Sequence, residues 1–211
     1  MSQGIDIPPF AFETYEEPSD PVTVAILDAA HAEFLSYGIR RATLDSVAKR
    51  AKVGRMTLHR RFATKQELVD AVFGRSNSRI VASIREVAAA QSTLMDALVE
   101  SLALGVELVR GDSLIARLIE TDPDAVIPYL AFDARALVRA STGYVVDEIA
   151  MLNPAFNTRG GRLAAEAVIR VCHSIILTPH AFDDLSDGSL LREFLQTVVV
   201  GLIPEPKSTD L

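Results

Sequence analysis

The amino-acid sequence predicts an all-α protein. Apolar residues recur every three or four positions through most of the chain, which is the spacing of one face of a helix. Capping residues, glycines and prolines bound these runs. The sequence has no persistent apolar–polar alternation and no Asn-Gly turn, which are the signals of strands and hairpins.

The first two helices are predicted to begin at Pro21 and after Thr43. Gly38 favours the end of the first helix, and Thr43 is a suitable N-cap for the second. Their apolar faces comprise Ile26, Leu27, Ala30 and Phe34, then Leu44, Val47, Ala48 and Ala51.

The next two helices follow a short turn, Lys52-Val53-Gly54. The third helix points Leu58 and Phe62 inward. A capping box opens the fourth, in which Thr64 and Glu67 satisfy each other's backbone donors.

Further helices are predicted in the C-terminal part of the chain. The Asp122-Pro123-Asp124 segment is a strong start, because it combines a cap, a proline at the first helical position and an acid in the first turn. These helices begin after Ser92 or Thr93, after Asp112, at Asp122 (to about Leu152), near Thr158 (to Leu177) and near Ser189 (to Ile203).

Composition excludes several classes of protein. The chain has 211 residues, 49% of them hydrophobic, which is enough to bury a core without disulfides. Its single cysteine, Cys172, excludes an internal disulfide and a cysteine-based zinc site. The histidines lack ligand spacing, so we expect no metal and no cofactor. The sequence shows neither a signal peptide nor an apolar run long enough for a membrane, so we expect a cytoplasmic protein.

Charge is unevenly distributed along the chain. Residues 1–20 carry five acids and no base, which predicts a disordered acidic tail. Residues 21–75 carry ten Lys or Arg and five Asp or Glu, although the whole chain has a net charge of −7. A basic segment within an acidic chain points to an anionic partner. Chance fluctuation in a short window is the alternative.

Residues 43–62 form the pattern of a helix, a three-residue turn and a second helix. Ala48 is small where the two helices must approach, and Val53 fills the turn. The second helix leaves polar and basic side chains on or near its outside: Arg55, Thr57, His59, Arg60 and Arg61. Such a helix suits the major groove of DNA. The alternative is an ordinary helical hairpin with a solvated basic face.

This segment resembles the N-terminal domain of the tetracycline-repressor (TetR) family. The resemblance spans residues 24–73 and rests on Ile26 to Ala30, Phe34, Gly38, Thr43, Val47-Ala48, Val53, Thr57 to Phe62 and Lys65 to Leu68. It implies a helix-turn-helix DNA-binding domain followed by a larger C-terminal helical domain. It also implies a homodimeric regulator, usually a repressor, that a small molecule releases from a palindromic operator.

The resemblance also implies roles for individual residues. Thr43 and Lys65 match positions that grip phosphates, and Arg55 and Thr57 match positions that touch bases or nearby phosphates. His59 stands where the family usually has a phosphate-bound Tyr. Gly54 replaces a common side-chain cap, and Met56 replaces a small residue or Pro. Arg60 and Arg61, farther along the helix, are expected to contact phosphate.

Two apolar stripes near the C-terminus form a candidate dimer interface. The alternative is that both stripes pack inside one subunit. Doubled by a two-fold axis, they would form a four-helix interface. The candidate interface residues are Leu163, Ala167, Val171, Ile175, Leu191, Phe194, Leu195, Val198 and Leu202.

The predicted organisation is therefore an acidic tail (1–20), a helix-turn-helix domain (21–73), a helical ligand-binding and dimerisation domain (74–205) and a C-terminal tail (206–211). The predicted function is a ligand-responsive DNA-binding regulator. A small-molecule-binding bundle or an enzyme without DNA function is the alternative, although no catalytic motif is present. The sequence identifies neither the effector nor the residues of its pocket.

Overall fold

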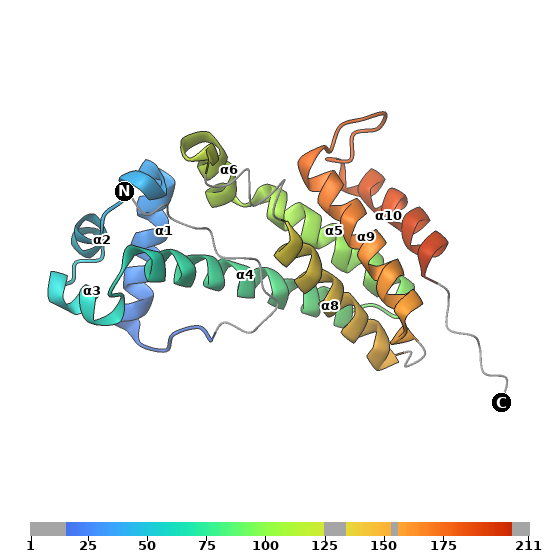
Figure 1. Ribbon diagram of the computed structural model, residues 1–211, viewed down its shortest axis with the longest axis horizontal. Coiled ribbons are helices and arrows are strands. Elements are labelled where there is room, and N and C mark those ends of the chain that lie inside the picture. Colours follow the sequence, from blue (N-terminus) through green and yellow to red (C-terminus); the bar gives the residue numbers. More distant parts are fainter. Residues whose placement is uncertain (1–15, 125–133, 153–155, 204–211) are drawn as a thin grey trace. The chain divides into compact units, whose positions relative to one another are not determined.

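The computed structural model describes residues 16–124, 134–152 and 156–203, and its described secondary structure is helical apart from one isolated bridge, His180 with Asp184 (Figure 1). The helices are α1 (Pro21–Arg41), α2 (Leu44–Arg50), α3 (Arg55–Arg61), α4 (Lys65–Ala89), α5 (Leu94–Gly111), α6 (Ser113–Thr121), α8 (Arg135–Leu152), α9 (Arg159–Leu177) and α10 (Gly188–Leu202). The predicted all-α fold class is confirmed.

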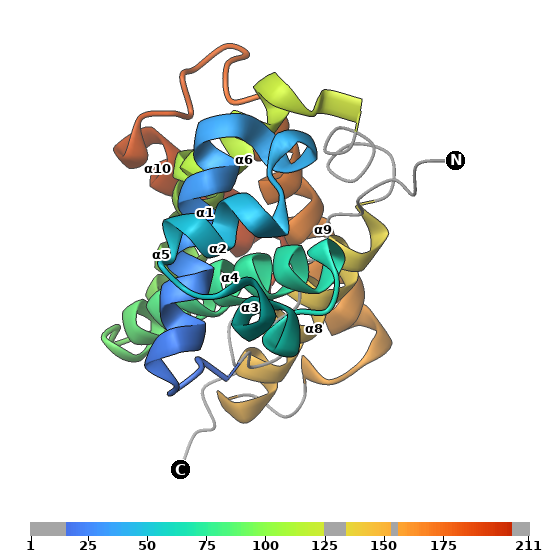
Figure 2. The same ribbon diagram turned by 90° about the vertical axis from the view of Figure 1, so that its left-hand side faces the viewer.

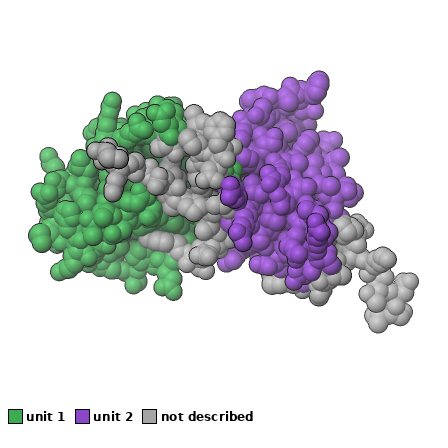
Figure 3. All heavy atoms as spheres, in the orientation of Figure 1, with its two compact units in different colours: residues 1–79, 111–134 green, residues 80–110, 135–211 purple. Residues whose placement is uncertain are grey.

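The chain divides into two compact units, coloured separately in Figure 3. Unit 1 comprises residues 1–79 and 111–134, and unit 2 comprises residues 80–110 and 135–211. These boundaries differ from the predicted division near residue 73, because α4 contributes to both units and α6 packs against α1 in unit 1.

Unit 1 is built around a core that α1, α2, α3, α4 and α6 share (Figure 2). Ile26, Phe34, Leu58 and Leu118 are completely buried in it. By length and hydropathy, α1 is the one described helix that could cross a membrane. Its apolar face instead forms the centre of this core.

Unit 2 is a helical bundle in which α9 packs against both α8 and α10 (Figure 1). Its core includes Ile149, Ala165, Val168, Leu195 and Val199, all completely buried. These apolar residues are buried at helical spacing, which explains the amphipathic pattern of their segments in the sequence.

Most of the predicted helix boundaries are confirmed by caps. The side chains of Thr43, Asp112 and Thr158 accept hydrogen bonds from the first turns of α2, α6 and α9. At Gly38 the backbone leaves the helical region, with φ 77° and ψ 162°. Three further residues follow before α1 ends.

Two local predictions were wrong in detail. The Thr64 hydroxyl accepts from Glu67 N at 3.1 Å, but the Glu67 carboxylate accepts from Ala63 N and not from Thr64. The helix predicted from Asp122 to Leu152 is not continuous, because Ala134 is a turn residue and α8 begins at Arg135. Residues 125–133 lie outside the described part of the chain.

The predicted tails are described only in part. Residues 16–20 have no regular structure, but Glu17 and Asp20 make ion pairs with arginines of unit 1. Residues 1–15 and the tail predicted over 206–211 lie outside the described residues.

Candidate nucleic-acid interface

Helices α2 and α3 form a helix-turn-helix with a well-bonded first helix and turn. Thr43 and Ser46 form a reciprocal capping box at the start of α2, with both bonds at 3.0 Å. After α2, Lys52 adopts a left-handed conformation and Val53 N donates to Ala48 O at 3.0 Å. Gly54 caps α3 without a side-chain bond, as the sequence predicted.

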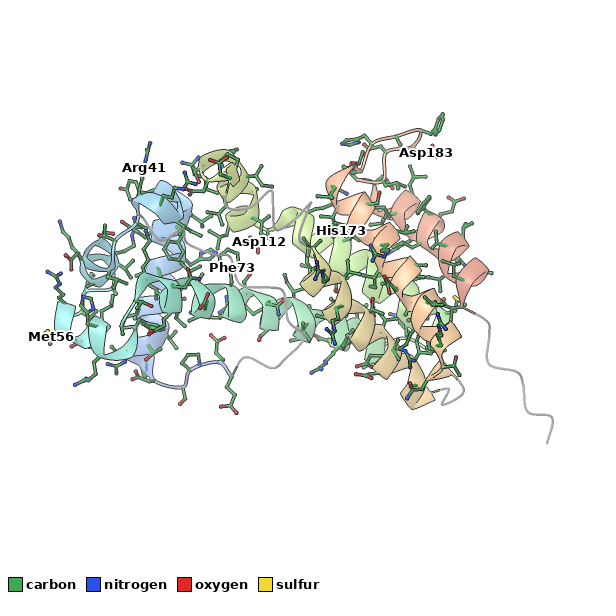
Figure 4. The ribbon with its side chains drawn as sticks, viewed as in Figure 1. Arg41, Met56, Phe73, Asp112, His173 and Asp183 are labelled. Carbon is green, nitrogen blue, oxygen red and sulfur yellow. The ribbon has the colours of Figure 1, made fainter. Side chains whose placement is uncertain are left out.

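The orientation of α3 follows from two buried anchors. Leu58 is completely buried and Phe62 is 7% exposed, so the opposite side of the helix faces solvent. Arg55, Met56 and Arg60 are exposed on this helix, whereas Thr57 and His59 are half-buried. Figure 4 shows Met56 at the outer edge of α3.

Among the described large apolar residues of unit 1, Met56 is the most exposed, at 80%. The DNA-contacting set predicted from the sequence does not include Met56, although helical spacing places this residue away from Leu58 and Phe62. An exposed methionine beside arginines can make apolar contact with a thymine methyl group in the major groove.

The exposed arginines of α3 have weak internal partners. Arg55 Nε lies 2.9 Å from Asp45 Oδ1, and both side chains are more than half exposed. An exposed pair of this kind contributes little to stability, so a phosphate or a base can replace the carboxylate. Arg60 makes no ion pair with any described residue.

Arg61 lies in a different environment from the other basic residues of α3. Its guanidinium donates to Asp20 Oδ2 at 2.7 and 2.9 Å and to the Thr23 hydroxyl at 2.9 Å. Hydrogen bonds from the Thr23 hydroxyl and from Arg61 lower the pKa of Asp20 to about 2. Because Asp20 is also the N-cap of α1, Arg61 ties the end of α3 to the start of α1.

Lys65, at the start of α4, faces the end of α1. Its Nζ donates to Arg40 O at 3.1 Å, and partial burial lowers its pKa while the charge of Asp122 opposes that shift. Asp122 is 3% exposed and accepts from Ile39 N at 3.1 Å. The carboxylate at the end of α6 therefore holds the backbone just before Thr43.

The candidate dimer residues divide into two groups. Ile175, Leu191 and Leu195 are buried within unit 2 and stabilise the single chain. Leu163, Phe194 and Leu202 are 58%, 40% and 40% exposed. Ala167, Val171 and Val198 are half-buried. Helices α9 and α10 therefore each bury one apolar face and leave a second apolar stripe uncovered.

In the part of the chain that the structure describes, no three His, Cys, Asp or Glu side chains gather where they could hold a metal ion. Cys172 is buried, and burial raises the pKa of its thiol to about 12.

Comparison with known proteins agrees with this architecture. Residues 26–72, from α1 into α4, match the family described as bacterial regulatory proteins, tetR family. The uncharacterized HTH-type transcriptional regulator Mb2274c of Mycobacterium bovis is 25% identical over 180 residues, which cover 84% of this chain and 92% of that protein. The HTH-type transcriptional activator FasR of Mycolicibacterium smegmatis is 27% identical over 132 residues, covering 63% of this chain and 60% of that protein.

A solved structure shows the same fold over most of the chain. The TetR family repressor AlkX of Dietzia has a TM-score of 0.56 and 24% identity, and the match covers 87% of this chain and 99% of that one. The matched sequence segment contains the complete helix-turn-helix, and the relatives are transcriptional regulators. The chain is a DNA-binding transcriptional regulator, and its helix-turn-helix segment, residues 26–72, matches the TetR family.

Proposed function

We propose that this regulator is a cytoplasmic, homodimeric repressor that binds a palindromic operator and leaves it when a small molecule binds. The observation that carries the proposal is the outward face of α3, where Arg55, Met56 and Arg60 are exposed above the buried Leu58. Two such helices, one from each subunit, would enter successive major grooves about 34–36 Å apart.

The contacts of the interface divide into base and phosphate contacts. Arg55 and Thr57, at the N-terminal end of α3, read bases, and Met56 joins them through a thymine methyl group. Thr43, His59, Arg60 and Lys65 bind phosphates. The bond from Lys65 to Arg40 O uses one of three ammonium hydrogens, so the others remain for a phosphate.

The surroundings of Arg61 favour a different role from the phosphate contact that the sequence predicted. Its guanidinium is bonded to Asp20 and Thr23 and its side chain is 23% exposed, so we assign it a positioning role at the base of α3. Replacement of Arg61 by Lys keeps the charge but loses the paired bonds to Asp20. This variant should therefore lower the stability of the helix-turn-helix more than Arg60→Ala does.

DNA binding is tested by the salt dependence of affinity. An operator is first selected from randomised palindromes, and fluorescence anisotropy is then measured over a range of KCl concentrations. The logarithm of the association constant should fall with the logarithm of salt by about 0.9 per phosphate contact. Lys65→Ala should flatten this slope by about one unit. Arg139→Ala, an exposed arginine of α8, is the matched control and should leave it unchanged.

A salt-insensitive interaction would contradict binding through this basic face. Repression itself is tested with a promoter that carries the operator, by transcription with purified RNA polymerase. Increased transcription on addition of the protein would make it an activator, as FasR is described, and would overturn the repressor assignment.

The dimer is proposed to form through the uncovered stripes of α9 and α10. Phe194 is 40% exposed in the single chain, so Phe194→Asp should fold but place an unpaired carboxylate in the interface. Gln196→Asp, exposed on the same helix outside the apolar stripe, is the matched control. Sedimentation should show a monomer for the first variant and a dimer for the second. A Phe194→Asp dimer that binds the operator normally would refute this interface.

The effector is proposed to bind in unit 2 and to favour a dimer whose α3 helices no longer match the operator spacing. Native mass spectrometry of the purified protein identifies a bound compound, and titration of that compound into the protein–operator complex tests release. A bound compound that leaves operator affinity unchanged would contradict its role as the effector.

A further inference from the structure

A small pocket in unit 1 lies between α1 and α4, and no residue of α2 or α3 lines it. Its volume is about 140 Å³. This is smaller than the roughly 300–1,000 Å³ of pockets that hold drug-sized ligands, so the space suits only a small molecule. The lining includes Leu27, Asp28 and His31 from α1, and Arg75 and Arg79 from α4.

Arg75 is a buried cation with an incomplete set of partners. Its side chain is 10% exposed. Its Nη2 pairs with Asp28, and its Nε lies 3.0 Å from Glu17 Oε1. Its Nη1 is buried and has no acceptor among the described residues. Because a buried donor without an acceptor is costly, an acceptor in the pocket would be stabilised there.

The ion pairs of Glu17 indicate that the two arginines of this site bind a carboxylate. Its carboxylate reaches the site from the segment before α1 and lies 3.0 Å from Arg75 Nε and 3.5 Å from Arg79 Nη2. Glu17 does not line the pocket itself, and its side chain is 47% exposed, so this carboxylate can leave the two arginines. Two guanidinium groups thus meet at one carboxylate oxygen.

The charges left when Glu17 departs define the class of ligand. Arg75 and Arg79 are positive and Asp28 is negative, so the site keeps one net positive charge and is neutralised by one anion. Leu27 and Val72 add apolar surface to the lining. An anion with a short apolar body therefore suits the pocket better than a compact dianion such as phosphate.

We propose that this pocket binds a small organic monocarboxylate, and that Glu17 occupies the site as the chain's own competing carboxylate. This site is separate from the DNA-contacting face of α3 and from the effector site proposed in unit 2. Its test needs no DNA, so the proposal can fail while the assigned function stands.

The test uses butyrate as the probe and the full chain as the receptor. Butyrate is titrated by isothermal calorimetry at constant ionic strength, with chloride as the balancing anion. Glu17→Gln removes the competing charge and should bind butyrate about fivefold more tightly than the unchanged chain, as expected for the loss of one partly exposed ion pair. Glu16→Gln alters the exposed neighbour, for which the structure shows no ion pair, and should bind like the unchanged chain.

A substitution of Arg79 tests the opposite change, because it removes a positive charge from the site. Its side chain is 64% exposed, so Arg79→Met should fold normally but lose most of the butyrate affinity. Neutral butyramide should not bind to the Glu17→Gln chain. Absence of saturable butyrate binding in Glu17→Gln would overturn the proposal. Binding that Arg79→Met leaves unchanged would place butyrate elsewhere and would also overturn it.

Discussion

The bend in α1 at Gly38 provides a sharp test of how unit 1 positions its DNA-contacting residues. Gly38 has a φ of 77° and a ψ of 162°, a conformation that residues with a Cβ rarely adopt. A Cβ at this position would lie 2.7 Å from Asp122 Oδ2 and 2.8 Å from Thr121 Oγ1. Gly38→Ala should therefore strain the backbone and displace the carboxylate that holds Ile39 N.

The magnitude follows from these two effects. A strained backbone conformation costs about 1–3 kcal/mol, and a buried N–H left without its acceptor costs about 1–3 kcal/mol more. Gly38→Ala should therefore lower the free energy of unfolding by about 2–6 kcal/mol, a large part of the stability of a typical domain. Because Arg40, Thr43 and Lys65 lie next to this bend, operator affinity of the folded variant should also fall.

The measurement is urea unfolding followed by far-ultraviolet circular dichroism, with operator binding measured at low temperature. Gly143→Ala is the control, because Gly143 lies within α8 and an added Cβ would project into open space. That variant should gain up to about 1 kcal/mol from helix propensity. A Gly38→Ala protein as stable as the unchanged chain, with unchanged operator affinity, would refute the reasoning.

Three other predictions concern separate parts of the chain. Asp20→Asn should flatten the loss of stability between pH 4 and pH 2, measured by thermal unfolding. The Asp20 carboxylate has its pKa lowered from 3.8 to about 2, so its contribution is present above that window and lost within it; parallel curves for variant and unchanged chain would contradict this. Arg55→Ala should cost about 1–3 kcal/mol of operator binding and relax the preference at one base pair per half-site. Selection from randomised half-sites measures this, and an unchanged selected sequence would count against base contact by Arg55. Gly161→Ala would place a Cβ 1.9 Å from the backbone carbonyl oxygen of Phe156. It should lower the free energy of unfolding, measured with urea, by about 1–3 kcal/mol or more. Gly160→Ala, whose Cβ would have no atom closer than 3.8 Å, should not.

Much of the fold could be predicted because helix signals are local. The caps Thr43, Asp112 and Thr158 bond to backbone groups two or three residues away. The sequence predicted Thr43 as a cap and placed the start of a helix at or near each of the other two. Apolar spacing likewise predicted that Leu58 is buried at the centre of unit 1. The same local rules predicted most of the helices and a division near residue 73, but they carry no information on which helices pack together, such as α6 against α1.

The candidate site was less predictable where long-range pairs decide a side chain's role. Arg61 looked like a phosphate contact, yet Asp20, 41 residues away, holds its guanidinium. Met56 could have been added to the recognition face, because helical spacing alone places it away from Leu58.

The sequence by itself determined the all-α class, the positions of the caps, and the outward side of α3, since all of these depend on residues within one or two helical turns. Only the tertiary structure decided the partners of the charged groups. It placed Asp122 against Ile39 N, 83 residues away, and brought Glu17 to Arg75 and Arg79. Such pairs form where distant segments pack, and their energy depends on burial and distance. Neither quantity can be read from residue spacing along the chain.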